Sequence, residues 1–103
     1  MINLLEQFNK AFESKARLGI MSVLMVNESL SFNALKELLT LTDGNLATHL
    51  RALEEAGYLS VQKQFVGRKP NTTYTATDAG RTAFAGHLNA LEEFIKQTPG
   101  TPG

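Results

Sequence analysis

The sequence has no cysteine, no long apolar run and no net charge, and each absence narrows what the chain can do. Without cysteine it can form neither a disulfide nor a thiolate metal site, and it has no redox-sensing thiol. No run approaches the roughly 18 apolar residues that a membrane-spanning helix needs. The segment Met1–Glu6 contains an acid where a secretory signal would carry positive charge, so we expect a cytoplasmic protein with no membrane partner.

The 10 basic and 10 acidic side chains are unevenly distributed. Residues 1–57 have a net charge of −2 and residues 78–103 of −1, whereas residues 58–77 have +3. A neutral total argues against strong electrostatic binding to nucleic acid, but a local concentration of cations can still dock on phosphates. The segment 58–77 is therefore where we expect an anionic partner to bind.

The length of 103 residues, 43% of them hydrophobic, is sufficient for one compact domain, which we assign to residues 1–97. Residues 98–103 repeat a Thr-Pro-Gly triplet and hold too few apolar groups to order themselves. They are expected to form a disordered tail without a function.

Helical periodicity dominates the first half of the chain. Leu5, Phe8 and Phe12 recur at helical spacing and predict an amphipathic helix within the first 13 residues. The segment Lys15–Val26 is apolar nearly all round and follows Ser14, a suitable N-cap. We expect this second helix to be the buried centre of the domain.

A short third helix is predicted next. Either Ser31 or Asn33 can cap it, and its apolar residues Leu35, Leu38 and Leu39 would face the core. Only a tight turn separates it from the helix that follows.

The fourth predicted helix has a signal at each end. Thr42 can accept a hydrogen bond from the amide of Asn45, Asp43 places a negative charge in the first turn, and Gly57 supplies the stop. Its buried stripe consists of Leu46, Leu50 and Leu53.

The exposed face of this helix carries small and hydrogen-bonding residues, which are Gly44, Thr48, Arg51 and Glu55, flanked by Asn45 and Ala52. Bulk at its N-terminal end would hold the backbone away from base edges, so this face suits the DNA major groove. Two short helices joined in this way predict a helix-turn-helix over residues 33–57. Taken alone, they fit a plain helical hairpin equally well.

The periodicity then changes to that of strands. Alternating apolar and polar residues predict a strand over 58–65, and a run of β-branched and aromatic residues predicts another over 72–77. Between them, 66–71 contains Gly, Pro and two adjacent cations, which predict a basic turn. A hairpin over 58–77, directly after a helix-turn-helix, is a wing whose charges can reach phosphates or the minor groove. The alternative is a merely solvated hairpin tip.

Thr77 and Asp78 begin a last helix that is predicted to run to about Gln97. Its stripe has heptad spacing and exceeds what a small wing needs for cover, which favours pairing with a second subunit over folding back on its own domain. The expected dimerisation helices are residues 1–13 and 78–97. Their contact residues are Leu5, Phe8, Phe12, Phe84, Leu88, Leu91 and Ile95.

Three stretches together resemble a known family: the run from Asp43 to Tyr58, the turn Gly67-Arg68-Lys69-Pro70, and residues 74–81. They are similar to bacterial and archaeal winged-helix transcriptional regulators, in the small one-domain branch related to the MarR and ArsR families. The resemblance covers about residues 18–81 with good specificity. It implies a homodimer, built through the first and last helices, that binds duplex DNA with two recognition helices and two wings.

The fold class that follows is mainly α with a small β-hairpin (α+β), a winged helix-turn-helix with terminal dimerisation helices. Metal-sensing ArsR-like proteins usually carry cysteine or His/Asp ligand sets, whereas this chain has no cysteine and two histidines. We therefore expect no metal and no cofactor.

Asn45, Thr48 and His49 are the candidates for base contacts, because Asn can pair bidentately with adenine and Thr offers a hydroxyl and a methyl group. His49 stands near the leucine stripe and could instead bond the backbone or a phosphate. Arg51 is expected to meet a phosphate, Lys36 is a further phosphate candidate, and the free amides at the helix N-terminus suit a phosphate oxygen. The full expected DNA-binding set is Thr42, Gly44, Asn45, Thr48, His49, Arg51, Lys63, Arg68, Lys69 and Asn71.

These features predict a sequence-specific regulator of transcription that binds a pseudo-palindromic duplex operator as a homodimer, acting as a repressor. An enzyme is not expected, because the two histidines fall on different helices and no metal-ligand spacing surrounds either of them. A winged helix that contacts protein instead of DNA is the alternative, because the net charge is zero. The sequence specifies no small-molecule effector.

Overall fold

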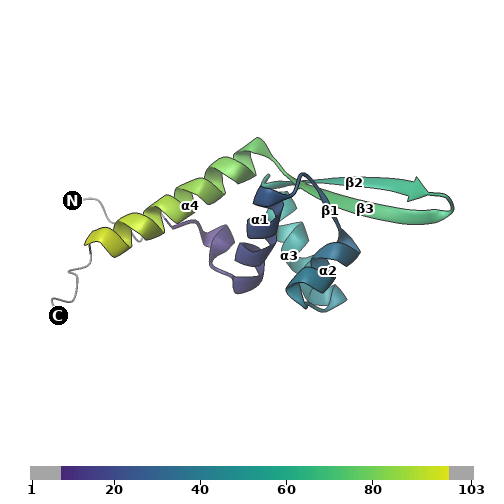
Figure 1. Cartoon of the computed structure of the whole chain (residues 1–103), viewed down its shortest axis with the longest axis horizontal. Coiled ribbons are helices and arrows are strands. Elements are labelled where there is room, and N and C mark those ends of the chain that lie inside the picture. Colours follow the sequence, from purple (N-terminus) through teal and green to yellow (C-terminus); the bar gives the residue numbers. More distant parts are fainter. Residues whose placement is uncertain (1–7, 98–103) are drawn as a thin grey trace.

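In the computed structural model, which describes residues 8–97, the helices gather at one end of a small antiparallel sheet, and a long hairpin of that sheet extends away from them (Figure 1). The predicted α+β winged-helix class is confirmed. In chain order the elements are η2 (Lys10–Phe12), α1 (Lys15–Val26), β1 (Leu30–Ser31), α2 (Phe32–Leu39), α3 (Asp43–Glu55), β2 (Leu59–Val66), β3 (Lys69–Ala76) and α4 (Asp78–Gln97).

Helix α1 lies at the centre of the domain, as its apolar composition predicts. Ser14 caps it by accepting a hydrogen bond from the amide of Arg17, and the face formed by Ile20, Met21 and Leu24 is fully buried. The helix contacts η2, α2, α3, α4 and β3, so all the other helices of the described residues and one strand of the sheet pack on it.

Helix α2 is capped by Ser31, which accepts from the amide of Ala34 at 3.1 Å. The expectation that its three leucines all face the core is wrong for one of them. Leu35 is fully buried and Leu39 packs against the core, but Leu38 is 58% exposed. At about 100° per residue, Leu39 stands about 40° from Leu35 around the helix, whereas Leu38 stands about 60° away on the other side, at the edge of the buried face.

The sheet has one strand more than the sequence predicted. The two-residue strand β1 pairs antiparallel with β3, with Leu30 opposite Tyr74, and the strand order is β1-β3-β2. A strand this short leaves no alternation to detect, because two residues cannot show a period of two.

The hairpin is longer and its turn tighter than predicted. Strands β2 and β3 pair from Leu59↔Ala76 to Val66↔Lys69, which leaves only Gly67 and Arg68 in the turn. Gly67 has φ +67°, a left-handed conformation that a two-residue hairpin turn requires. Three residues predicted to lie in the turn, Lys69, Pro70 and Asn71, therefore belong to β3.

The wing and α4 meet at a close backbone contact. The Thr77 amide donates to the Tyr58 carbonyl at 3.0 Å, and the Thr77 hydroxyl donates to the Gly57 carbonyl at 2.7 Å while accepting from the amide of Gly80. Gly80 lies so near Tyr58 that a Cβ at this position would stand 2.2 Å from the Tyr58 carbonyl oxygen. Thr77 thus caps α4, as predicted, and joins it to the start of β2.

The expected N-terminal dimerisation helix is not what residues 8–13 form. Residues 10–12 make a single 3-10 turn, and Phe12 is fully buried in the core of its own chain, edge-on to Phe84. Phe8 contacts His87 and Phe94 of α4. Phe8 and Phe12, which were predicted to contact a second subunit, both contact α4 of their own chain. Leu5 and the tail 98–103 lie outside the described residues.

The Asn9 amide donates to Nδ1 of His87 at 3.0 Å, and the Asn9 side-chain amide donates to the Tyr58 hydroxyl at 2.8 Å. These bonds hold the segment before α1 against α4 and the start of the wing. Phe84 itself is only 4% exposed, so neither it nor Phe12 is available as a surface contact. The part of the α4 stripe that stays exposed consists of Leu88, Leu91, Phe94 and Ile95.

Candidate nucleic-acid interface

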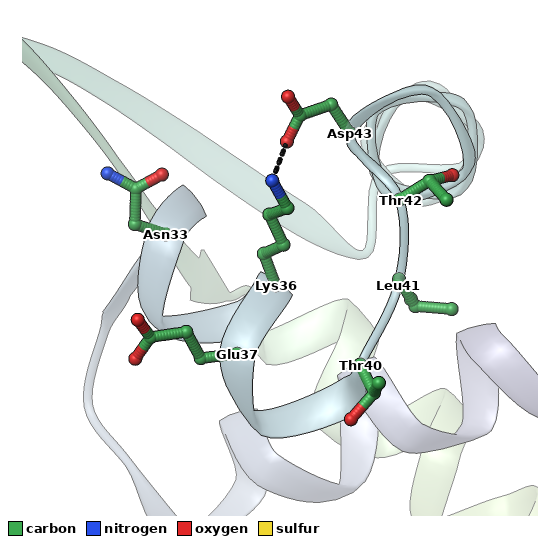
Figure 2. A pocket seen from close by; sticks show the side chains of 7 residues that line it. All are labelled: Asn33, Lys36, Glu37, Thr40, Leu41, Thr42 and Asp43. Carbon is green, nitrogen blue, oxygen red and sulfur yellow. Dashed lines mark ion pairs between the residues drawn. The ribbon is translucent and has the colours of Figure 1, made fainter.

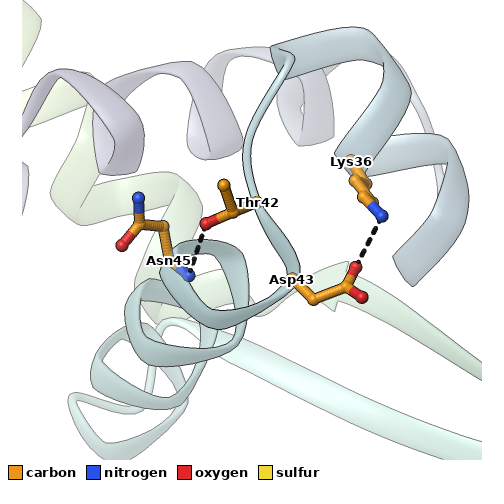
Figure 3. Close-up of polar contacts among 4 residues, drawn as sticks. All are labelled: Lys36, Thr42, Asp43 and Asn45. Carbon is orange, nitrogen blue, oxygen red and sulfur yellow. Dashed lines mark hydrogen bonds and ion pairs between the residues drawn. The ribbon is translucent and has the colours of Figure 1, made fainter.

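The N-terminal turn of α3 presents its polar side chains to solvent. Thr42 accepts from the amide of Asn45 at 3.2 Å, which is the predicted cap (Figure 3). The Thr48 hydroxyl donates to the Gly44 carbonyl at 2.9 Å. All four residues are exposed, while the opposite stripe of leucines is buried. The bond made by Thr48 uses its hydroxyl proton and leaves the lone pairs of the hydroxyl oxygen able to accept.

An ion pair ties α2 to the same turn. Lys36 Nζ lies 2.8 Å from a carboxylate oxygen of Asp43, across an open pocket of about 710 Å³ formed by α2, the turn and the start of α3 (Figure 2). The side chains of Lys36 and Asp43 are 42% and 73% exposed, so the pair is screened by solvent and contributes little to stability. Its effect is electrostatic, because Lys36 offsets the acid that stands at the N-terminus of α3.

A second cleft, of about 560 Å³, separates α3 from the wing. Arg51 and Glu54 line it from α3, and Lys63 and Tyr74 line it from the two strands. Side chains alternate across a strand, and the pairs Val61↔Tyr74 and Lys63↔Thr72 place these residues on the hairpin face that looks toward α3. Arg51 and Lys63, both exposed, therefore border the same cleft from opposite sides.

Tyr74 is a feature of this cleft that sequence reasoning missed. Burial raises the pKa of its hydroxyl, and the nearby Glu54 carboxylate raises the pKa further. The group is therefore a neutral hydrogen-bond donor at physiological pH, suited to a phosphate or sugar oxygen. Its position follows from the pairing Val61↔Tyr74, a register that the sequence alone does not fix.

The wing cations are divided between the faces and the tip of the hairpin. Lys63 is on the α3-facing side, Arg68 is in the turn, and Lys69 pairs with Val66 on the opposite side. All three are exposed, whereas Asn71 is half-buried. Among residues 58–77, which the structure describes throughout, there is no acid to neutralise them.

His49 differs from its neighbours among the expected base contacts. It is half-buried, and its Nδ1 is buried without a hydrogen-bond partner in the described chain. It lines a pocket of about 570 Å³ with residues of α1 and the α2–α3 turn, so its ring is turned partly toward α1. Asn45 and Thr48, by contrast, are exposed.

No group of three or more His, Asp or Glu side chains within residues 8–97 is arranged to hold a metal ion. Across the same range, none of the helices is both long and apolar enough to cross a membrane.

Comparison with known proteins agrees with this arrangement. Residues 16–95 match the family described as winged helix DNA-binding domain. A protein of Methanocaldococcus jannaschii described as uncharacterized is 38% identical over 87 residues, covering 84% of this chain and 95% of that protein.

Among solved structures, a transcriptional regulator homologue from Pyrococcus horikoshii OT3 is 30% identical, with a TM-score of 0.73 over 88% of this chain and 95% of that one. The transcriptional repressor CouR, solved with a 23-mer DNA duplex, shares the fold at 19% identity, with a TM-score of 0.71 over 94% of this chain and 70% of that one. Regulators of the MarR and ArsR families share it as well. The chain belongs to the family of winged helix DNA-binding domains, with the fold of the MarR and ArsR transcriptional regulators.

Proposed function

We propose that this protein is a homodimeric transcriptional repressor that binds a pseudo-palindromic DNA operator through α3 and the wing. The observation that carries the proposal is the cleft between the exposed face of α3 and the hairpin, with Arg51 and Lys63 on its two sides. A duplex placed against α3 would bring its phosphate backbone to this cleft. The solved complex of CouR with DNA, which has the same fold, supports the proposal.

The two elements have different roles in the proposal. Helix α3 contains Asp43, Glu54 and Glu55 against Arg51 alone, so it is net acidic and attracts phosphates poorly. Its contribution is base selection, with Asn45 and Thr48 facing base edges in the major groove. The wing, with three cations and no acid, supplies most of the electrostatic attraction.

In the proposed dimer, the two chains contact each other through α4. Leu88, Leu91 and Ile95 are 46%, 43% and 64% exposed, and they follow heptad spacing along the last part of the helix. Two copies joined through this stripe would present two α3 helices to half-sites one helical turn apart, roughly 34 Å. A repressor needs no surface beyond these, because occupying an operator is enough to block transcription from it.

The test is fluorescence anisotropy with a labelled duplex from the region upstream of the protein's own gene, beside a shuffled duplex of equal length, at several salt concentrations. Arg51, Lys63, Arg68 and Lys69 give eight cations in a dimer, so log K should fall against log salt with a slope of about −7. The upstream duplex should bind more tightly than the shuffled one. Absence of binding at low salt, or binding without a salt slope, would overturn the proposal and leave contact with another protein as the role of the fold.

A further inference from the structure

The wing carries two large apolar side chains that are open to solvent. Phe65 is 74% exposed and Val66 is 66% exposed, both next to the cations of the tip. Burying such a side chain contributes about 1.5–3 kcal/mol in a protein core, and this hairpin leaves both outside the core. Contact with a partner would remove this apolar surface from water.

The hairpin register separates the two residues. Phe65 pairs with Pro70 on the face that also carries Val61 and Lys63, which is the face that lines the cleft with α3. Val66 points to the other face, opposite Lys69. Only Phe65 therefore shares a side with α3, and the ring of Pro70 directly across the ladder gives it a rigid apolar support.

The charges around Phe65 identify the kind of partner. Lys63, Arg68 and Lys69 are the charged groups of the hairpin, and an apolar protein groove would have to bury or neutralise all three. A second copy docking by this same face would place like charges together. Duplex DNA offers what both parts of the surface need, since phosphates surround the cations and base faces accept an aromatic ring.

We propose that Phe65 is a minor-groove wedge, which inserts between base pairs beside the site read by α3 and bends the duplex; this inference rests on the DNA-binding function proposed above. Phe65 lies four residues beyond Val61, about 13 Å along the strand. The minor groove next to a major groove occupied by α3 is about half a helical turn away, roughly 17 Å. Apolar side chains used in this way unstack one base step and kink the duplex, and a flexible pyrimidine–purine step at that position makes the kink less costly.

The wedge has a second consequence for specificity. A residue that unstacks a base step selects sequences by their deformability, without a hydrogen bond to any base. Phe65 thus adds sequence preference at a position that α3 does not reach, while Arg68 and Lys69 hold the flanking phosphates.

The experiment measures bending and binding together. A 30-base-pair operator duplex with donor and acceptor dyes at its ends reports the bend by energy transfer, and a 2-aminopurine placed at the proposed step reports unstacking. The wild-type protein should raise both signals. Phe65→Ala should bind about tenfold more weakly and return both signals nearly to those of free DNA, with the salt slope unchanged because no cation is lost. Phe65→Leu, which keeps an apolar wedge, should retain most of the bend.

Val66→Ala is the matched control, because it removes a similarly exposed apolar side chain from the opposite face of the same hairpin, and it should behave as wild type. Circular dichroism checks that each variant is folded. Salt-dependent binding without a rise in either signal, or equal behaviour of Phe65→Ala and Val66→Ala, would overturn the wedge and leave the proposed function standing. A wild-type protein that binds no DNA at low salt would overturn both.

Discussion

The wing and α4 extend from opposite ends of the domain, and both expose apolar side chains (Figure 1). The charges beside those side chains differ. Phe65 and Val66 stand among cations only, whereas the exposed stripe of α4 stands beside Lys96, which pairs with two glutamates of the same helix at 3.1 and 3.9 Å. Cations on a hairpin that has no acid of its own suit a polyanion, and charges that neutralise each other within one helix suit a second protein chain. The exposed fractions of the apolar side chains do not distinguish these two surfaces, whereas the charges around them do.

The largest effect on stability is expected from a substitution where the wing meets α4. Gly80→Ala would place a Cβ 2.2 Å from the Tyr58 carbonyl oxygen, so either α4 or the start of β2 must shift. We expect a loss of about 3 kcal/mol in the free energy of unfolding, the upper part of the range for overpacking. Thermal denaturation should show a fall in Tm of about 15 °C.

Gly86→Ala in the same helix is the matched control, because no atom lies within 4 Å of a Cβ there. It should raise stability by up to about 1 kcal/mol, since alanine is the better helix former. If both variants unfold at the wild-type temperature, the close contact between Gly80 and Tyr58 does not hold α4 against the start of β2.

This junction also shows where prediction from sequence stops. The caps Ser14, Thr42 and Thr77 were predicted correctly, because a hydroxyl bonding an amide three residues ahead is a local event. The contact between Gly80 and Tyr58 joins residues 22 positions apart and leaves no periodic signal. The buried role of Phe12 was missed for the same reason, since helical spacing tells which residues share a face and not which surface covers that face.

In the candidate interface too, the local features could be predicted from the sequence and the long-range contacts could not. The polar face of α3 could be predicted from helical periodicity and the basic tip from composition. The cleft between α3 and the wing could not, because it depends on the register that sets Tyr74 and Lys63 beside Arg51. A one-residue slip of the hairpin would move Lys63 and Phe65 to the far side.

The second prediction concerns the exposed apolar stripe of α4. Leu91→Glu would bury a carboxylate without a partner in the proposed dimer, and we expect the dimer dissociation constant to rise about a hundredfold. Analytical ultracentrifugation across micromolar concentrations measures it. Asn89→Glu adds the same charge at an exposed position off the stripe and should leave the dimer intact. A wild-type protein that sediments as a monomer at these concentrations would contradict the proposed role of α4.

In the wing, the double variant Arg68→Ala, Lys69→Ala should weaken binding to all DNA sequences alike, by about thirtyfold. A dimer loses four cations, so the salt slope should fall in magnitude by about 3 to 4. The control Lys10→Ala, Lys96→Ala removes the same charge from exposed positions outside the wing and should change neither quantity by as much. Equal effects of the two double variants would show that the wing acts only through the total charge of the protein.

Asn45→Ala should act on selectivity, in contrast to the wing variant. Loss of a bidentate contact to adenine should reduce the preference for the operator over a shuffled duplex about fivefold, with the salt slope unchanged. Competition anisotropy with the two duplexes measures this ratio. A uniform loss of affinity on both duplexes would place Asn45 on the backbone, and base selection would then fall to Thr48.

The smallest effect is expected from Asp43→Asn. Asp43 is an acid at the N-terminus of α3, 73% exposed and paired with Lys36. Its removal releases Lys36 for a phosphate and lessens repulsion at the helix end, so binding to every sequence should tighten about threefold. The loss of a favourable charge near the helix dipole should lower stability by about 0.5 kcal/mol, which thermal denaturation can detect.

Glu13→Gln, an exposed acid outside the helix-turn-helix, provides the comparison for the same change in net charge. If the two variants tighten binding equally, only total charge matters at this end of α3. If Asp43→Asn alone tightens it, the N-terminus of α3 lies close to the DNA backbone. The acid would then hold affinity below its maximum, so that discrimination between sequences depends on the base contacts of α3 more than on the attraction supplied by the wing.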